Sequence, residues 1–201
     1  MNSMEYQWLA VQPYEPVWQM LHARADAVAA ALQNEIIYCC EHEPVYTTGR
    51  RGVDNRLGAV LHAPVVHSDR GGEMTFHGTG QIMLYPVIHL RNREIGVKRY
   101  VHLLEQSCIE LLKESGIDAK RNCGFPGVWT EKGKIAALGV RITKGVAYHG
   151  MALNVDVDPK WFAAINPCGL CSAAVSISDF TEPQALSDLA NRWQNSFQTL
   201  L

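Results

Sequence analysis

The second half of the chain carries short apolar runs separated by turns that contain lysine and glycine. Runs of strand length occupy residues 128–130, 134–142 and 147–155, and the turns between them occupy 131–133 and 144–145. Strands joined by turns of two or three residues that include glycine are typical of antiparallel hairpins. This half of the chain is therefore predicted to form successive antiparallel hairpins.

The rest of the chain alternates between helical and strand patterns. Apolar residues recur at helical spacing after Pro13, over 96–115 and over 182–201, and a helical turn is expected at 158–162. Further strands are predicted at 5–11, 35–41, 64–69 and 82–90. The run at 35–41 is continuously apolar, so it should lie in the sheet centre with Cys39 and Cys40 in the core. Cys108 falls on the apolar side of the helix at 96–115 and is also expected in the core.

Length and composition limit the classes of protein to consider. The 201 residues, 22.4 kDa, suit one domain that spans residues 1–201, and 47% hydrophobic with 19% charged residues is typical of a soluble globule. A formal charge of −2 argues against nucleic-acid binding, which needs a basic patch. The N-terminus has no signal-peptide pattern and no apolar run reaches membrane-spanning length. We therefore expect a cytoplasmic protein with no membrane partner.

A glycine-rich segment is the most unusual local feature. It reads Arg70-Gly-Gly-Glu-Met-Thr-Phe-His-Gly-Thr-Gly-Gln81, and an apolar strand follows it. Glycines let the backbone approach a ligand closely or adopt a positive φ. A plain hairpin turn would need only Gly71 and Gly72. Because the segment continues through His77 to Gly80, a turn combined with a binding surface fits it better.

The six cysteines of a cytosolic chain are better interpreted as thiols or metal ligands than as disulfides. Cys168 differs from the others because Pro167 and Gly169 flank it in a loop, which exposes the thiol. It is either a nucleophile or a passive loop cysteine. Cys168 and Cys171 form a C-x-x-C pair, but no second pair follows for a zinc site, and the preceding hairpins do not suit a thioredoxin-like motif.

Other residues have both a functional and a structural interpretation. Lys134 opens an apolar strand and is either a water-exposed turn lysine paired with Glu131 or a general base beside a thiol. His42 follows a buried strand and is interpreted first as a hydrogen-bonded histidine of the core or its rim. Arg50 and Arg51 either bind an acidic partner or lie in a solvated loop. Small residues on adjacent strands leave room for a slender apolar ligand or for close packing: Ala136, Ala137, Gly139, Gly150 and Ala152.

Taken together, these motifs resemble the octanoyltransferases of lipoate biosynthesis, from about Tyr38 to Ser176. In order they are Arg70-Gly-Gly-Glu-Met-Thr-Phe-His-Gly-x-Gly-Gln81, Gly127-Val-Trp129, Lys134-Ile-Ala-Ala-Leu-Gly139, His149-Gly-Met-Ala-Leu-Asn-Val155 and Asn166-Pro-Cys-Gly169. One departure is Ala137, where many members of that family carry a serine. Alanine has no hydroxyl, so a side-chain hydrogen bond that a serine could make at this position is lost, while the backbone N–H groups remain.

The resemblance implies an α+β fold, with a mixed, largely antiparallel sheet packed against helices as in biotin and lipoate protein ligase catalytic domains. It implies acyl transfer through a cysteine thioester, with Cys168 as nucleophile, Lys134 as acid/base partner, and neither a cofactor nor a metal ion. The substrate-binding residues that it implies are Arg70, Gly71, Gly72, Glu73, Met74, Thr75, Phe76, His77, Ala137, Leu138, Gly139, Gly150, Met151 and Ala152. His42 and His149 are expected nearby.

The partners that the resemblance implies are octanoyl-acyl carrier protein as donor, and lipoyl domains of 2-oxoacid dehydrogenases and the glycine cleavage H protein as acceptors. Burying about six methylenes of an octanoyl chain contributes roughly 5 kcal/mol, which supports capture of the chain without a cofactor. Backbone N–H groups near Gly139 or Cys168 are expected to form an oxyanion hole. Acidic partners would meet a basic surface, for which the candidates are Arg50, Arg51, Arg70, Lys98 and Lys144.

Two other functions compete with this interpretation. An ATP-dependent lipoate or biotin ligase of the same fold would activate a free acid and would need no cysteine nucleophile. A non-catalytic module could bind lipoyl domains or acyl carriers without forming an acyl-enzyme. ATP dependence distinguishes the first from a transferase, and binding that survives Cys168→Ser without any acyl-enzyme distinguishes the second.

Overall fold

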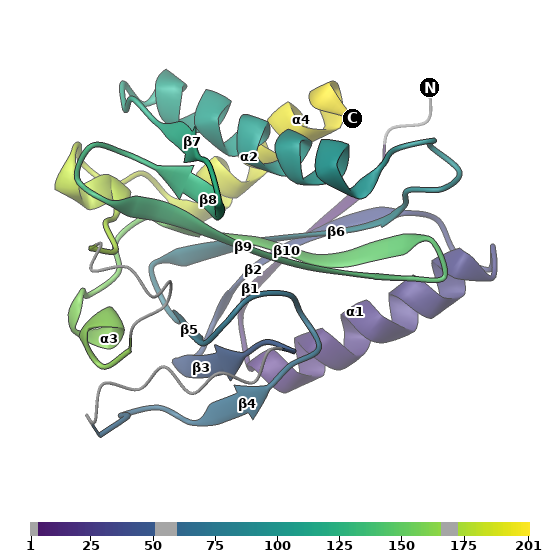
Figure 1. Cartoon of the computed structure of the whole chain (residues 1–201), viewed down its shortest axis with the longest axis horizontal. Coiled ribbons are helices and arrows are strands. Elements are labelled where there is room, and N and C mark those ends of the chain that lie inside the picture. The colour runs from purple at the N-terminus through teal and green to yellow at the C-terminus, as the bar shows by residue number, and fades with distance from the viewer. Residues whose placement is uncertain (1–3, 51–59, 166–172) are drawn as a thin grey trace.

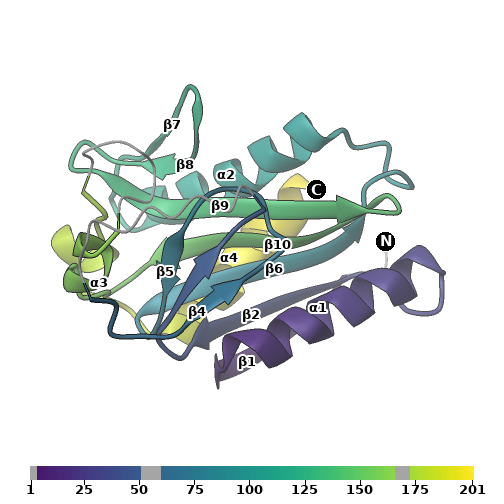
Figure 2. The same ribbon diagram turned by 60° about the horizontal axis from the view of Figure 1, so that its bottom comes forward.

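The computed structural model describes residues 4–50, 60–165 and 173–201. A seven-stranded sheet forms its centre, and a three-stranded sheet lies against one face of it (Figures 1 and 2). In spatial order the large sheet contains β1 (Glu5–Gln12), β2 (Ile36–His42), β6 (Gln81–His89), β10 (Val146–Asn154), β9 (Lys134–Thr143), β8 (Phe125–Trp129) and β7 (Lys120–Asn122). The small sheet contains β4 (Val65–His67), β3 (Val45–Thr48) and β5 (Thr75–His77).

Helices cover both faces of the large sheet. Figure 1 shows α2 (Val97–Glu114) and α4 (Leu186–Leu200) on one face, and α1 (Tyr14–Ala29) with the small sheet on the other. The short α3 (Lys160–Ala163) lies near β5, and a 3₁₀ turn spans Ile177–Asp179. No helix in the described part of the chain is long and apolar enough to cross a membrane.

The strand pairing confirms the predicted mixed, largely antiparallel sheet. Within the large sheet, β1 pairs with β2 in parallel, and the other neighbours are antiparallel. The predicted hairpins are present as β8–β9 and β9–β10. Lys144 and Gly145 join β9 to β10 with φ values of 50° and 85°. Positive φ at both central residues is the geometry that a two-residue hairpin turn needs, which explains the lysine–glycine sequence.

Some predicted boundaries were wrong. The predicted helical spacing after Pro13 extends to Leu32, but the first helix ends at Ala29 and Leu32 is 79% exposed. The last helix begins at Leu186 instead of residue 182, since Pro183 lies in the segment before it. The strand β7 was missed because its Lys-Arg-Asn sequence has no apolar residue.

The two helical layers enclose separate cores. Side chains from α2 and α4 pack on one face of the large sheet with Cys39 and Cys108, and α1 packs on the other face with Cys40. All three thiols are buried, as predicted. Beyond the N-terminal end of α1, the small sheet and the loop before β5 cover the same face of the large sheet (Figure 2). The cavity described next lies in that region.

Candidate active site

A cavity of about 390 Å³ opens between the large sheet and the loop that precedes β5. Its floor is built from β6, β10 and β9, where Ala152 lies opposite Met83 on one side and Ala137 on the other. In the next row Gly150 faces Gly139. These small residues leave the space above the sheet open, so the interpretation as room for a slender ligand is the one that the geometry supports.

The residues predicted to bind substrate come together at this cavity, with one exception. Those that line it are Arg70, Gly71, Gly72, Glu73, Met74, Thr75, His77, Ala137, Leu138, Gly139, Gly150, Met151 and Ala152, and Lys134 and His149 line it as well. Phe76 does not: its ring stacks on Trp161 with centroids 4.7 Å apart. Successive side chains of a strand point to opposite sides, so Phe76 faces away from the cavity that Thr75 and His77 line. Cys168 and Cys171 lie outside the described residues.

Arg70 is a buried structural cation, with 7% exposure. Its Nη2 donates to the carbonyl oxygens of Thr47 and Glu73, each at 2.7 Å, and its Nη1 donates to the Gly71 carbonyl at 2.8 Å. The expectation that Arg70 belongs to a basic docking surface is therefore wrong. Its guanidinium instead holds the loop over the cavity, because the loop carbonyls have turned inward to accept these bonds.

The same loop is hydrogen-bonded to β9 of the large sheet. The backbone N–H of Gly71 donates to the Val140 carbonyl of β9 at 3.0 Å. Loop and strand are so close that a Cβ on Gly139 would lie 2.7 Å from the Gly71 oxygen. A side chain at Gly139 would push the loop away from the floor, so glycine is needed for this close approach.

A chain of hydrogen bonds orients His77 at the cavity wall. The Asn154 amide donates to the Val175 carbonyl at 3.0 Å, Gln81 Nε2 donates to Asn154 Oδ1 at 2.7 Å, and Gln81 Oε1 lies 2.8 Å from His77 Nδ1. The Val175 carbonyl can only accept, so it fixes the orientation of the Asn154 amide, which in turn fixes that of Gln81. Gln81 therefore presents its oxygen to His77, so the ring hydrogen lies on Nδ1. Burial and the charge of Arg70 hold the pKa of His77 well below its ordinary value. His77 is therefore neutral, with Nε2 left as an acceptor.

His42 does not line the cavity but supports a residue that does. Its Nδ1 donates to the Gln12 carbonyl at 2.9 Å, and its Nε2 accepts from the hydroxyl of Tyr85, also at 2.9 Å. Tyr85 lines the cavity. His42 is thus a hydrogen-bonded core histidine that fixes the direction of the Tyr85 hydroxyl. Burial lowers the pKa of His42 to about 4.

The pKa of His42 predicts a loss of stability in acid. In the unfolded chain the imidazole binds a proton below a pH of about 6.5, whereas the folded state binds it only near its lowered pKa. The contribution of neutral His42 is therefore complete above about pH 6.5 and is lost as the pH falls toward about 4, with a size on the order of 3 kcal/mol. His42→Gln should flatten this part of the dependence in urea unfolding between about pH 7 and 4.5.

The matched control for this change is His22→Gln, at an exposed position of α1. That variant should keep the dependence of the wild type. If lowering the pH reduced the free energy of unfolding equally in wild type and His42→Gln, the pH dependence could not be assigned to His42.

Lys134, the first residue of β9, is half-buried at the cavity. Its Nζ lies 5.3 Å from the centre of the Trp129 ring, within the range of a cation–π contact. Its side chain passes so close to Gly127 that a Cβ there would lie 2.6 Å from Cε. Its backbone pairs with the segment that follows Cys168 and Cys171 in sequence, since its N–H donates to Ala173 and its carbonyl accepts from Val175, both at 3.0 Å. The water-exposed turn lysine of this hairpin is Lys132, whose Nζ donates to the Asp179 carbonyl.

Sequence reasoning missed other residues that line the cavity. They are Tyr14, Gln81, Met83, Tyr85, Gly124, Phe125, Pro126, Val140, Asn154, Phe162 and Ala174. The alternation in β6 could have identified Gln81, Met83 and Tyr85, because every second residue of a strand shares a face. Nothing in the sequence points to Phe125 or Pro126.

Among the described residues, no group of three His, Cys, Asp or Glu side chains could hold a metal ion.

Known structures with the same architecture define the class of fold. A lipoate-protein ligase A bound with ATP matches with a TM-score of 0.73 over 98% of this chain and 85% of that chain, at 14% identity. A biotin protein ligase from Aquifex aeolicus matches with a TM-score of 0.58 over 98% of this chain and 68% of that chain, at 10% identity. The fold is therefore that of the lipoate and biotin protein ligase catalytic domains.

Sequence similarity is more specific. Residues 13–198 match the model of the lipoyl protein ligase A/B catalytic domain. A curated octanoyltransferase from Thiobacillus denitrificans is 46% identical over 81% of this chain and 74% of its own length. Another, from Escherichia coli, is 38% identical over 96% of this chain and 91% of its own length. The chain belongs to the lipoyl protein ligase A/B catalytic domain family and, within it, to the octanoyltransferases, which are acyltransferases of lipoate biosynthesis.

Proposed function

We propose that residues 1–201 form a single catalytic domain that moves an octanoyl group from octanoyl-acyl carrier protein to a lysine of a lipoyl domain through a thioester on Cys168. The observation that carries the proposal is the shared cavity, in which Lys134 and the glycine and alanine floor meet. Among the described residues, the lining of this cavity combines glycines and alanines, which leave space for an acyl chain, with one primary amine, that of Lys134. Those are the two features that transfer of a medium-length acyl chain requires.

The chemistry has two halves. The Cys168 thiolate attacks the carbonyl of the donor thioester, the tetrahedral intermediate collapses, and the thiol of the carrier leaves with a proton. The neutral amine of the acceptor lysine then attacks the Cys168 thioester and gives up a proton to the acid/base group as the intermediate collapses, which forms the amide and returns the thiolate. One positioned acid/base group can donate the first proton and accept the second, and Lys134 is proposed for this role.

Binding of the acyl chain supplies the energy of recognition. About six methylenes contribute roughly 5 kcal/mol when they leave water. In the floor formed by β9 and β10, Gly139 and Gly150 lie opposite each other, so no side chain covers the backbone there. We propose that the N–H groups near Gly139 stabilise the oxyanion.

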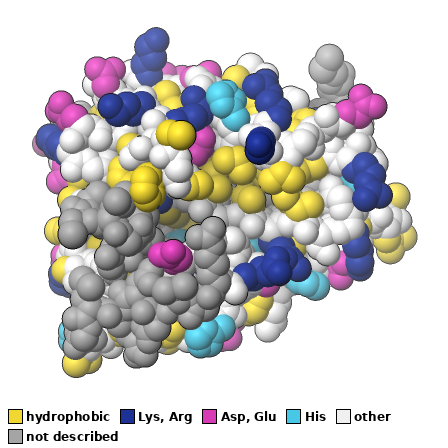
Figure 3. All heavy atoms as spheres, viewed as in Figure 1, with side chains coloured by type: hydrophobic (Ala, Val, Ile, Leu, Met, Phe, Trp, Pro, Cys, Tyr) yellow, Lys and Arg dark blue, Asp and Glu magenta, His cyan; other side chains and the backbone are white. Residues whose placement is uncertain are grey.

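Membership of the octanoyltransferase family supports the proposed donor and acceptor domains. One structural neighbour is an archaeal bipartite lipoate protein ligase from Thermoplasma acidophilum, solved in work on that ligase and its E2 lipoyl domain. We propose lipoyl domains of 2-oxoacid dehydrogenases and the glycine cleavage H protein as acceptors here. Lys and Arg side chains border an apolar band on the face shown in Figure 3, which suits acidic partners. Lys98 and Arg50 are exposed candidates for such contacts.

The wild-type protein tests the proposal directly. Its intact mass is measured after mixing with octanoyl-acyl carrier protein, without ATP. A hydroxylamine-sensitive increase by one octanoyl group, which disappears when a lipoyl domain is added, supports the transferase. Octanoylation of the lipoyl domain that requires ATP and free octanoate would support a ligase instead, and binding with no adduct would support a non-catalytic module.

A further inference from the structure

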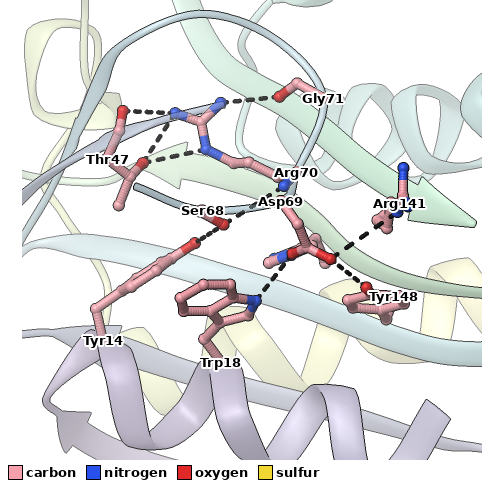
Figure 4. A network of polar contacts seen from close by, with 10 residues as sticks. Tyr14, Trp18, Thr47, Ser68, Asp69, Arg70, Gly71, Arg141 and Tyr148 are labelled. Carbon is pink, nitrogen blue, oxygen red and sulfur yellow. Dashed lines mark hydrogen bonds and ion pairs between the residues drawn. The ribbon is translucent and has the colours of Figure 1, made fainter. Parts of the chain in front are cut away.

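A second polar cluster lies next to the cavity and is centred on Asp69, which is not among the residues that line it. Trp18 Nε1 donates to Asp69 Oδ1 at 2.9 Å, and His149 Nε2 donates to the same oxygen at 2.8 Å. The hydroxyl of Tyr148 donates to Oδ2, and Arg141 Nε lies 3.9 Å from Oδ2 (Figure 4). One carboxylate therefore joins α1 and β10, with an arginine of β9 beside it.

Asp69 directly precedes the loop over the cavity, and the side chain of the next residue, Arg70, contacts a different part of the fold. Arg70 bonds to Thr47 in β3 of the small sheet, whereas Asp69 bonds to α1 and to the large sheet (Figure 4). The next residue of the loop, Gly71, also donates a backbone hydrogen bond to Val140 of β9. Two consecutive side chains of opposite charge thus tie the start of the loop to two different sheets.

The backbone of β10 is distorted where it meets Asp69. His149 has a φ of 59°, in the left-handed region that residues other than glycine rarely adopt. In the register of β10 and β6, Pro86 falls opposite His149, and the paired residues resume only at Met151 and Ala147 on either side. Proline has no N–H to donate, so the ladder is interrupted at this point. In a regular strand Tyr148 and His149 would point to opposite faces, yet both reach Asp69.

The hydrogen bonds to Asp69 favour its ionised form. Burial alone would raise the pKa of the carboxyl, but the hydrogen bonds from His149 and Tyr148 outweigh burial and hold its pKa below the ordinary range. Burial lowers the pKa of His149 in spite of Asp69, so the ring is neutral and carries its hydrogen on Nε2. An ionised carboxylate accepts only, which is what three converging donors require.

We propose that Asp69 is a positioning residue for acyl binding, whose carboxylate sets the height of the loop at residues 70–74 above the glycine and alanine floor. It touches no substrate. It acts through Arg70, whose guanidinium donates to the Thr47 carbonyl, and through Gly71, whose backbone N–H donates to the Val140 carbonyl. The identity of the ligand rests on the proposed function, whereas the effect of Asp69 on the loop does not.

The test is Asp69→Asn, which keeps the shape of the side chain. An amide has one acceptor oxygen and brings two donor hydrogens, so with Oδ1 kept toward Trp18 and His149 its Nδ2 forces the Tyr148 hydroxyl to turn and accept. The amide also lacks the negative charge that faces Arg141. The KM for octanoyl-acyl carrier protein should rise about 10-fold or more, while kcat stays within about threefold of the wild type. Tyr148→Phe removes one donor and leaves the carboxylate with two, so its KM should rise less.

The matched control is Asp26→Asn, at an exposed carboxylate of α1 that accepts from Lys144 at 2.8 Å. It should leave KM and kcat unchanged. A fall in kcat with unchanged KM in Asp69→Asn would mean that the residue supports only the folded state, and would overturn the proposal.

Hydrogen exchange gives a readout that needs no activity. In Asp69→Asn, peptides that cover residues 70–74 should exchange about 10-fold faster, because the Gly71 amide depends on the loop position, and peptides of α2 should not change. Exchange that is unchanged at 70–74, or faster everywhere, would overturn the proposal. If the wild type transfers no octanoate, the proposed function fails, and exchange alone then decides the role of Asp69.

Discussion

Replacing Cys168 by alanine should abolish the octanoyl adduct and lower octanoyl transfer by about 10³-fold or more. The reason is that both halves of the proposed reaction pass through a bond to this sulfur, and no other group can replace a thiolate that is both nucleophile and leaving group. Adduct formation is measured by intact mass with octanoyl-acyl carrier protein, and transfer by the mass of the lipoyl domain.

Cys171→Ala is the matched control, because it removes the other thiol of the C-x-x-C pair. It should keep both the adduct and the transfer. An adduct that persists in Cys168→Ala would mean that another cysteine is the nucleophile. The buried thiols of Cys39, Cys40 and Cys108 are poor alternatives, because burial raises the pKa of each and keeps it protonated. Cys123 is exposed and would be the next to replace.

Most of the fold could be predicted because its signals are local. The turn at Lys144 and Gly145 is encoded in two residues, and the hairpin that it joins follows from the apolar runs beside it. The floor of the cavity could be predicted for the same reason, since small residues in adjacent runs leave space wherever two hairpin strands pair. Register then aligns Gly139 with Gly150 without any further information.

The environment of a charged side chain could not be predicted in the same way. An arginine is usually exposed, and the burial of Arg70 depends on Thr47, which is 23 residues away. Asp69 depends on partners that are 51 residues away in α1 and 80 residues away in β10. Such contacts are set by how the two sheets pack, and no local pattern records them. Phe76 was predicted to line the cavity along with its whole segment, but its ring lies on the other side of β5 from Thr75 and His77 and stacks on Trp161.

Replacing Lys134 by methionine should lower octanoyl transfer by about 10²–10⁴-fold, the usual contribution of a general acid or base. Methionine keeps much of the length of the side chain beside Gly127 and Trp129 but cannot carry a proton. The strand should stay in place, because the backbone of Lys134 bonds to Ala173 and Val175 whatever its side chain. Transfer is measured in the steady state, and the unfolding temperature is measured beside it.

Lys132→Met provides the matched control two residues earlier on the same hairpin. Lys132 is exposed, and its ammonium lies 4.3 Å from the centre of the Phe180 ring, outside the cavity. It carries the same charge as Lys134, so any effect of net charge on the acidic partners should be shared by the two variants. A large loss in Lys134→Met alone therefore assigns the effect to proton transfer at the cavity. Equal and small losses in both would leave the lysine with a role only in partner binding. The acid/base group would then have to be sought among the other residues of the cavity wall.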